Sequence, residues 1–290
     1  MGDVVSNFSN FTGSSSKINE VVFLNNEANT VFAGGERVYL KGGVLETDLT
    51  VYPDANSDTF AYSGTNFSVA SQDTAPIGIT WDGTYFWVIG NSTDSVYKYN
   101  ASGVYQGVSF SVASQDTVPS GIAWDGTYFW VIGLITDSVY KYNASGVYQG
   151  VGFSVASEES APTDIAWDGT YFWVIGLTKV YKYNASGVYQ GVSFTRESGK
   201  PPNMSGITFD GTSLWVVGTA HDKAYKYSVS GAYEGVSFDV SQDSRDAGIT
   251  WDGTNLWVVG TTGDKAYKYI PAVGIESDTS FGGQNYVRVK

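Results

Sequence analysis

Five copies of one sequence unit follow each other along the chain, with a period of 42 or 43 residues. Each copy carries an Asp-Gly pair after an aromatic residue, at Trp81, Trp124, Trp167, Phe209 and Trp251. A Tyr-x-Tyr element follows in every copy, starting at Tyr97, Tyr140, Tyr181, Tyr225 and Tyr267. Self-similarity at a fixed period of this size indicates stacked copies of one supersecondary unit. The repeats therefore limit the possible folds more than any other feature.

One repeat is predicted to form four short strands, here named A to D in chain order. In the second copy they are Gly121 to Trp124, Tyr128 to Gly133, Ser138 to Tyr142 and Val147 to Phe153. The Asp-Gly pair predicts a two-residue hairpin between A and B, because both positions accept positive φ. No segment has a sustained 3.6-residue period, so we expect no helix. Four strands per repeat predict an all-β fold, a five-bladed β-propeller.

The ring is predicted to close through a strand from the N-terminal side. A Tyr-x-Gly-x-x-Phe pattern in strand D follows repeats one to four, as in Tyr105 to Phe110, and is missing after repeat five. The same pattern stands ahead of repeat one, from Tyr62 to Phe67. We therefore expect residues 61–69 to complete the fifth blade, which removes open sheet edges. A non-closing solenoid is the alternative.

These boundaries divide the chain into a propeller and two flanks. The propeller is predicted at 61–270, with repeats near 74–116, 117–159, 160–201, 202–243 and 244–270 and the closing strand at 61–69. Residues 1–60 and 271–290 lack the repeat but contain alternating, strand-like runs such as 286–290. Closure places residues 61 and 270 in one blade. We therefore expect the flanks to pair into one small anchoring β module, with two unpaired tails as the alternative.

Charge and composition exclude several partners. Acidic residues outnumber basic ones 29 to 16, for a net charge of -13, which argues against nucleic-acid binding. No cysteine is present, so disulfides and thiolate metal sites are excluded. The N-terminal residues show no basic patch followed by an apolar run, and no long apolar stretch occurs elsewhere. We expect no signal peptide, no membrane insertion, no metal and no cofactor.

Any ligand site is expected on the face that carries the B–C and D–A loops. The A–B and C–D turns keep their sequences between repeats, whereas the B–C and D–A loops differ, and loops on a rigid frame commonly carry binding. Neutral drift of exposed loops is the alternative. The candidate binding residues are Asp94, Asp137, Asp164, Glu197, Lys200, His221, Asp222, Arg245 and Asp264.

Each candidate also has a simpler interpretation. Four aspartates recur just before strand C, and recurrence favours turn formation through Asx bonds over metal sites: Asp94, Asp137, Asp222 and Asp264. His221, the only histidine, is more typical of a solvated loop side chain. Asp164 replaces a glycine that the other four A strands share, so we expect it at the channel mouth. There it would bind a cation or a sugar hydroxyl, or else cap a turn.

Five equivalent tryptophans on strand B allow two interpretations. If exposed, they would be sugar-stacking platforms of a multivalent lectin, and if buried, they would form the core between blades. Equivalent apolar positions favour the core. The residues are Trp87, Trp130, Trp173, Trp215 and Trp257.

The flanks carry a resemblance to a known class of protein. The runs 20–24, 36–48 and 286–290 resemble tail-fibre and related virion proteins of aquatic bacteriophages, and the repeats resemble propeller repeats of such proteins. The resemblance implies a structural virion protein whose propeller is displayed on the particle surface. It implies other virion proteins as partners of residues 1–60 and 271–290, a host-surface glycan or receptor as a ligand, and a homo-oligomer in the particle. It carries over no catalytic residues.

An enzyme and a lectin are the competing functions. Propeller hydrolases and lactonases share this architecture, but fold does not carry function. With one histidine, no cysteine and one unusual aspartate, the sequence yields no nucleophile–base pair and no metal cluster. We therefore expect no enzyme. A lectin would gain avidity from five equivalent weak sites.

Overall fold

The computed structural model describes residues 30–33, 36–41, 44–45, 60–195, 203–218, 222–271, 275–278 and 286–289. The chain divides into two units. One is Thr59–Ile270, and the other contains the two flanks, Met1–Asp58 and Pro271–Lys290. Every described element of regular structure is a β-strand.

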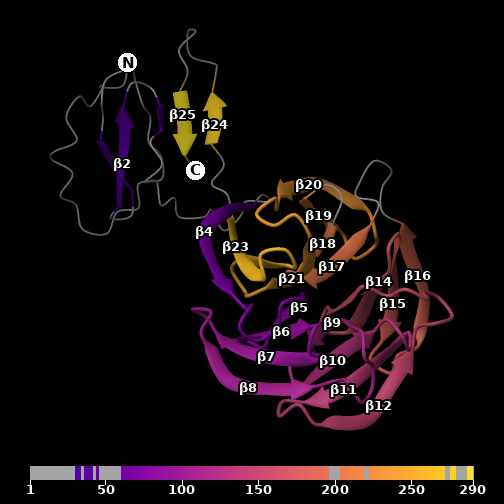
Figure 1. Ribbon diagram of the computed structural model, residues 1–290. Coiled ribbons are helices and arrows are strands. Elements are labelled where there is room, and N and C mark those ends of the chain that lie inside the picture. The colour runs from indigo at the N-terminus through magenta and orange to yellow at the C-terminus, as the bar shows by residue number, and fades with distance from the viewer. Residues whose placement is uncertain are drawn as a thin grey trace. The chain divides into compact units, whose positions relative to one another are not determined.

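The first unit is a five-bladed β-propeller, as the sequence predicts (Figure 1). Each blade is a four-stranded antiparallel sheet with strand A innermost and strand D outermost. Blade one contains β5 (Pro76–Trp81), β6 (Tyr85–Gly90), β7 (Ser95–Asn100) and β8 (Tyr105–Ser111). Blade two contains β9 (Pro119–Trp124), β10 (Tyr128–Gly133), β11 (Ser138–Asn143) and β12 (Tyr148–Ser154). Blade three contains β13 (Asp164–Trp167), β14 (Tyr171–Ile175), β15 (Lys179–Asn184) and β16 (Tyr189–Thr195). Blade four contains β17 (Met204–Phe209), β18 (Leu214–Gly218), β19 (Lys223–Tyr227) and β20 (Tyr233–Asp239).

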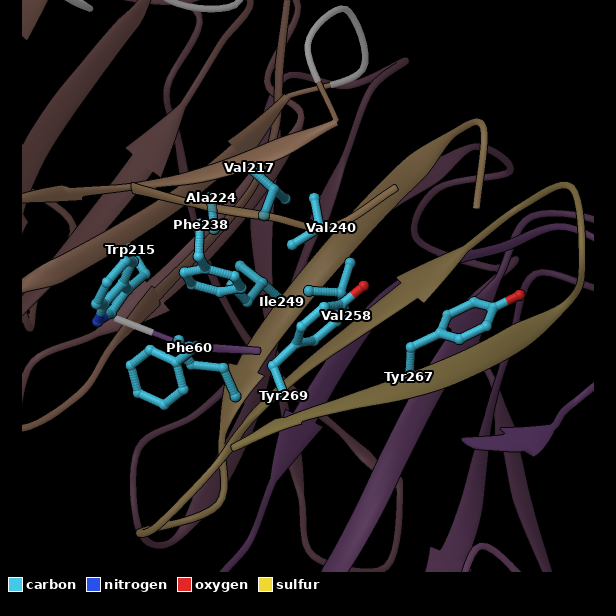
Figure 2. Close-up of a cluster of buried hydrophobic side chains, with 11 residues drawn as sticks. Phe60, Trp215, Val217, Ala224, Phe238, Val240, Ile249, Val258, Tyr267 and Tyr269 are labelled. Carbon is cyan, nitrogen blue, oxygen red and sulfur yellow. The ribbon is translucent and has the colours of Figure 1, made fainter. Parts of the chain in front are cut away.

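Blade five is built from both ends of the propeller segment. It contains β21 (Asp246–Trp251), β22 (Leu256–Gly260), β23 (Lys265–Pro271) and, as its outer strand, β4 (Phe60–Ser68). Ser63 Oγ donates a hydrogen bond to the Lys268 carbonyl oxygen at 3.0 Å. Phe60 lies in a cluster of buried side chains between blades four and five, 5.4 Å from Trp215 and 5.3 Å from Phe238 between ring centroids (Figure 2). The predicted closure is confirmed.

The Tyr-x-Gly-x-x-Phe pattern of the outer strand has a packing reason. Phe110 of blade one reaches the next blade, with its ring 5.7 Å from Phe129 and 5.5 Å from Tyr142. Gly107 has φ +69° and lies where the β7–β8 register shifts, which marks a β-bulge. A bulge on an exposed outer strand interrupts the edge that another chain would otherwise extend.

Two glycines of blade one provide a matched test of closure. Gly103 and Gly107 have φ +76° and +69°. A Cβ on Gly103 would lie 2.2 Å from Phe67 Cβ of the closing strand, whereas one on Gly107 meets nothing within 4 Å. We expect Gly107→Ala to cost about 1–2 kcal/mol of unfolding free energy from backbone strain alone, and Gly103→Ala to cost clearly more. Urea unfolding measures both, and equal losses would contradict the packing of Phe67 against this turn.

The A–B turn differs from the expected two-residue hairpin. Three residues, Asp82, Gly83 and Thr84, separate β5 from β6, and only Gly83 has positive φ, at +96°. Asp82 Oδ1 accepts a hydrogen bond from the Tyr85 amide at 2.7 Å, and Asp82 Oδ2 accepts one from Trp87 Nε1 at 2.7 Å. The same indole–carboxylate bond occurs in all five blades. The aspartate therefore recurs because it pairs a buried N–H donor, which would be costly if left unpaired.

The flank unit contains two small sheets among its described residues. β1 (Thr30–Ala33), β2 (Glu36–Lys41) and β3 (Val44–Leu45) form one, and β24 (Ile275–Asp278) and β25 (Tyr286–Val289) form the other. None of these described strands pairs across the two flanks. The joint anchoring module stays a prediction.

Candidate functional site

The B–C and D–A loops of a blade are held together by a buried carboxylate. Asp73 Oδ1 accepts a hydrogen bond from the Ala75 amide at 2.7 Å within its own D–A loop. Its Oδ2 accepts bonds from the Thr93 amide at 3.0 Å and the Thr93 hydroxyl at 2.6 Å in the B–C loop. Asp116 and Asp243 join the corresponding loops of blades two and five. In blades one, two and five, the predicted binding face therefore rests on loops with fixed bases.

These loop carboxylates are not among the predicted site residues, although their spacing in the sequence reveals them. Asp73, Asp116 and Asp243 each stand eight residues before the tryptophan that ends strand A. A glycine at the end of strand B leaves space for each, because a Cβ on Gly90 would lie 2.0 Å from the Asp73 carboxyl carbon. At this spacing blade four has Pro201, so the repeat loses the carboxylate there.

The aspartates that precede strand C serve backbone geometry. Asp94, Asp137, Asp222 and Asp264 have φ between +47° and +50°, a left-handed conformation that aspartate tolerates better than most residues. The Asp94 carbonyl accepts a bond from the Val112 amide at 2.8 Å, which joins the B–C loop to the end of strand D. The expected Asx bond is not what fixes this turn, because Asp94 Oδ1 is buried without a hydrogen-bond partner.

The remaining loop candidates do not gather into one constellation. Arg245 is exposed, and its amide donates to Asp243 Oδ1 at 3.0 Å. Glu197, Lys200 and His221 lie outside the described residues.

The same face exposes three large apolar side chains in neighbouring blades. Leu134 and Ile135, in the B–C loop of blade two, are 38% and 66% exposed, and Leu177 in blade three is 46% exposed. The corresponding B–C loops begin with Asn91 in blade one and Thr261 in blade five. The apolar side chains thus make one side of this face distinct, and exposed apolar groups are frequent in protein contacts.

Asp164 is not at the channel mouth, and that prediction is wrong. It belongs to an inner ring of five equivalent positions, the others being Gly78, Gly121, Gly206 and Gly248. The ring is so narrow that a Cβ on Gly121 would lie 2.6 Å from Asp164 Cα, and one on Gly248 would lie 2.7 Å from Gly78 Cα. Asp164 is 2% exposed, and its Oδ2 accepts a bond from the Ile207 amide of blade four at 2.9 Å. It therefore links two A strands at the axis.

A cavity of about 170 Å³ lies on the axis, beside the inner ring. It is lined by the last three residues of all five A strands, from Ile79-Thr80-Trp81 in blade one to Ile249-Thr250-Trp251 in blade five. These residues precede the A–B turns, so this axial cavity lies at the opposite end of strand A from the D–A loops, where the sequence analysis expected a ligand.

Another buried acid, Asp246, lies between blades four and five. Asp246 stands where the other A strands have Pro76, Pro119, Pro162 and Met204. It is 1% exposed, and neither carboxyl oxygen has a hydrogen-bond partner. Burial, and then the charges of Asp222, Asp243 and Asp239, raise its pKa to about 8. Such a group holds a proton at neutral pH.

The strand-B tryptophans form core, and the favoured interpretation is confirmed. All five are buried, each indole N–H is bonded to an aspartate, and a lysine lies near each ring. In blade one, Lys98 Nζ lies 5.2 Å from the Trp87 ring centroid. These rings are therefore not available as sugar platforms.

Two absences hold for the described part of the chain. Within it, no three His, Cys, Asp or Glu side chains are grouped as metal ligands. Among the same residues, no helix has the length and apolar character needed to span a bilayer.

Comparison with known proteins supports the fold alone. No family model matches the sequence, and no curated protein matches it. The glutaminyl cyclase of Myxococcus xanthus is similar in structure, with a TM-score of 0.57 and 8% identity over 73% of this chain and 95% of that chain. Virginiamycin B lyase from Staphylococcus aureus gives a TM-score of 0.45 at 16% identity, over 89% of this chain and 93% of that chain. A chain of a nidogen/laminin complex gives 0.47 at 15% identity, over 64% and 72%. The similarity to the glutaminyl cyclase supports the β-propeller fold of this chain.

Proposed function

We propose that this protein is a non-enzymatic component of a bacteriophage particle, a tail fibre or another appendage, whose propeller contacts a host surface or another protein. The main support for this proposal is the position of the propeller between the two flanks in the chain. The propeller segment starts and ends on neighbouring strands of blade five, β4 and β23. A domain inserted in this way is presented as a unit between its two flanks, which leaves the flanks for assembly with other virion proteins.

The contact surface of this proposal is the B–C and D–A face, around Leu134, Ile135 and Leu177 of blades two and three. The loop carboxylates hold the bases of the B–C loops, so a partner meets a preorganised surface and less conformational entropy is lost on binding. Five equivalent lectin sites receive no support from the buried tryptophans.

A competition experiment tests the contact surface. Soluble full-length protein should compete with the particle for adsorption to host cells, and the pair Leu134→Ser and Ile135→Ser should abolish competition. The matched control is the pair Val104→Ser and Val147→Ser in the C–D turns, whose side chains are 57% and 56% exposed. If the control and loop variants compete equally well, the proposed contact face is wrong. If the protein is absent from purified particles by mass spectrometry, the virion assignment is wrong.

A further inference from the structure

The backbone at the inner edge of the ring faces the axial cavity. The Asp82 amide donates to the Tyr85 carbonyl at 3.0 Å, so this residue of blade one bonds toward strand B. Because an antiparallel strand alternates the side on which it bonds, Thr80 also bonds toward strand B, and Ile79 and Trp81 direct their N–H and C=O groups to the axis. The Ile207 amide of blade four likewise points toward the axis, because it donates a hydrogen bond to Asp164 Oδ2. The cavity wall is therefore a ring of main-chain donors and acceptors.

The side chains of this wall are unequal around the ring. Blades four, five and one contribute Thr208, Thr250 and Thr80, and these blades are consecutive in the closed ring. Blades two and three contribute Ala123 and Ala166 at the same position. At this position one half of the axial cavity thus carries hydroxyl groups, and the other half carries methyl groups.

The charges around the cavity are negative. No lysine or arginine lines it. Each A–B turn begins with an aspartate directly after the last lining residue: Asp82, Asp125, Asp168, Asp210 and Asp252. A recess of one charge sign concentrates ligands of the opposite sign, so this cavity selects cations.

The volume of the axial cavity limits the size of its ligand. At about 170 Å³ the cavity is larger than the roughly 30 Å³ that one water occupies and smaller than the roughly 300 Å³ of ordinary small-molecule sites. A bare metal ion would leave most of it to water. A primary ammonium group has three N–H donors for carbonyl and hydroxyl acceptors, and it is attracted to aromatic rings such as the four tryptophans among the lining residues.

We propose that the axial cavity binds the ammonium end of a small alkylamine, with its charged group on the main-chain carbonyls and the threonine half, and its alkyl part on Ala123 and Ala166. The ammonium group belongs either to a free amine or to an exposed lysine side chain. This site is separate from the contact face around Leu134, and it does not depend on where the protein is located.

Calorimetry and tryptophan fluorescence at constant ionic strength test the proposal on the full chain. The probes are n-butylammonium, for the free amine, and Nα-acetyl-lysine amide, for the side chain. We expect saturable binding of one molecule of at least one probe, with a dissociation constant on the order of 1 mM, as suits a ligand of few atoms. 1-Butanol, which has the same carbon chain without charge, should bind at least tenfold more weakly. If 1-butanol binds equally, or potassium displaces the amine at equal concentration, the ammonium assignment is overturned.

Substitutions test whether the amine binds in the axial cavity and not elsewhere on the protein. Thr208→Val and Thr250→Val keep the side-chain shape and remove a hydroxyl, so each should weaken amine binding several-fold. Thr117→Val, in an exposed D–A loop on the other face, should leave binding unchanged. Unchanged binding in the double variant Thr208→Val/Thr250→Val would overturn the site. If that variant does not fold, the comparison of the amine with 1-butanol on the wild-type protein still decides whether the cavity selects the ammonium group.

Discussion

A chain that starts after residue 70 is expected to lose its cooperative unfolding transition. The deletion removes β4, and with it Phe60 from the cluster between blades four and five. It also removes Phe67, whose ring lies 5.6 Å from Trp257 and 5.7 Å from Phe86 across the junction of blades five and one. Loss of a buried phenylalanine costs about 3–5 kcal/mol. Losing both phenylalanines, together with the hydrogen bonds of β4, costs as much as the unfolding free energy of an ordinary domain, or more.

A shorter deletion provides the control. A chain that starts at Thr59 keeps β4 and lacks the N-terminal flank, which belongs to the other unit. It should melt cooperatively and close to the temperature of the full chain. Calorimetry distinguishes the two deletions. If the chain that starts after residue 70 melts as sharply, and at the same temperature, as the chain that starts at Thr59, the closing strand contributes no stability and the closure argument fails.

The ring and its closure could be predicted because each depends on a repeated pattern. The displaced Tyr62 to Phe67 copy has one place where its tyrosine and phenylalanine find the partners that their equivalents have, and that place is blade five. Strand positions followed from the same repetition, and the B strand of blade two begins at Tyr128 and ends at Gly133 as expected. The five copies support the same strand assignment, so an ambiguous residue in one copy does not change the predicted strands.

The predictions of the Asp164 position and of the A–B turn failed for different reasons, a contact between blades and a contact within one blade. Asp164 was expected at the channel mouth because its neighbours in sequence are strand residues near the axis. Its actual role depends on Ile207 of the next blade and on how closely the inner glycines approach each other. The A–B turn was assigned by a local dipeptide rule, whereas Asp82 is fixed by the indole of Trp87. The contact between Asp164 and Ile207 joins two blades and has no signature in local spacing, whereas the pairing of Asp82 with Trp87 recurs at a spacing of five residues in every blade.

Stability is expected to fall as the pH rises from 5 to 8, and two buried acids cause this. Burial raises the pKa of Asp246 to about 8, and burial likewise raises the pKa of Asp164 well above its ordinary value, against the opposing effect of nearby amides. An aspartate in the unfolded chain titrates near 3.8. Between these values the folded protein holds a proton that the unfolded chain has released. Their contribution is therefore fully present below the unfolded pKa. Asp246 lowers the unfolding free energy by about 1.4 kcal/mol per pH unit until the pH passes about 8, and Asp164 acts in the same direction.

Asp246→Asn is the variant that tests this most directly. Asparagine has the shape of the protonated acid and does not ionise, so the variant should resemble the wild type below about pH 4, where aspartate keeps its proton in the unfolded chain too. At pH 8 it should be more stable than the wild type by a few kcal/mol, on the order of one proton's linkage over that range. Asp137→Asn in blade two is the control, because Asp137 is not among the carboxylates that raise the pKa of Asp246, and asparagine also tolerates the left-handed backbone at that position. Urea midpoints measured across this range give the slopes. A slope for Asp246→Asn parallel to that of the wild type would show that Asp246 is ionised and paired in the folded protein, contrary to its two unpartnered oxygens in the structure.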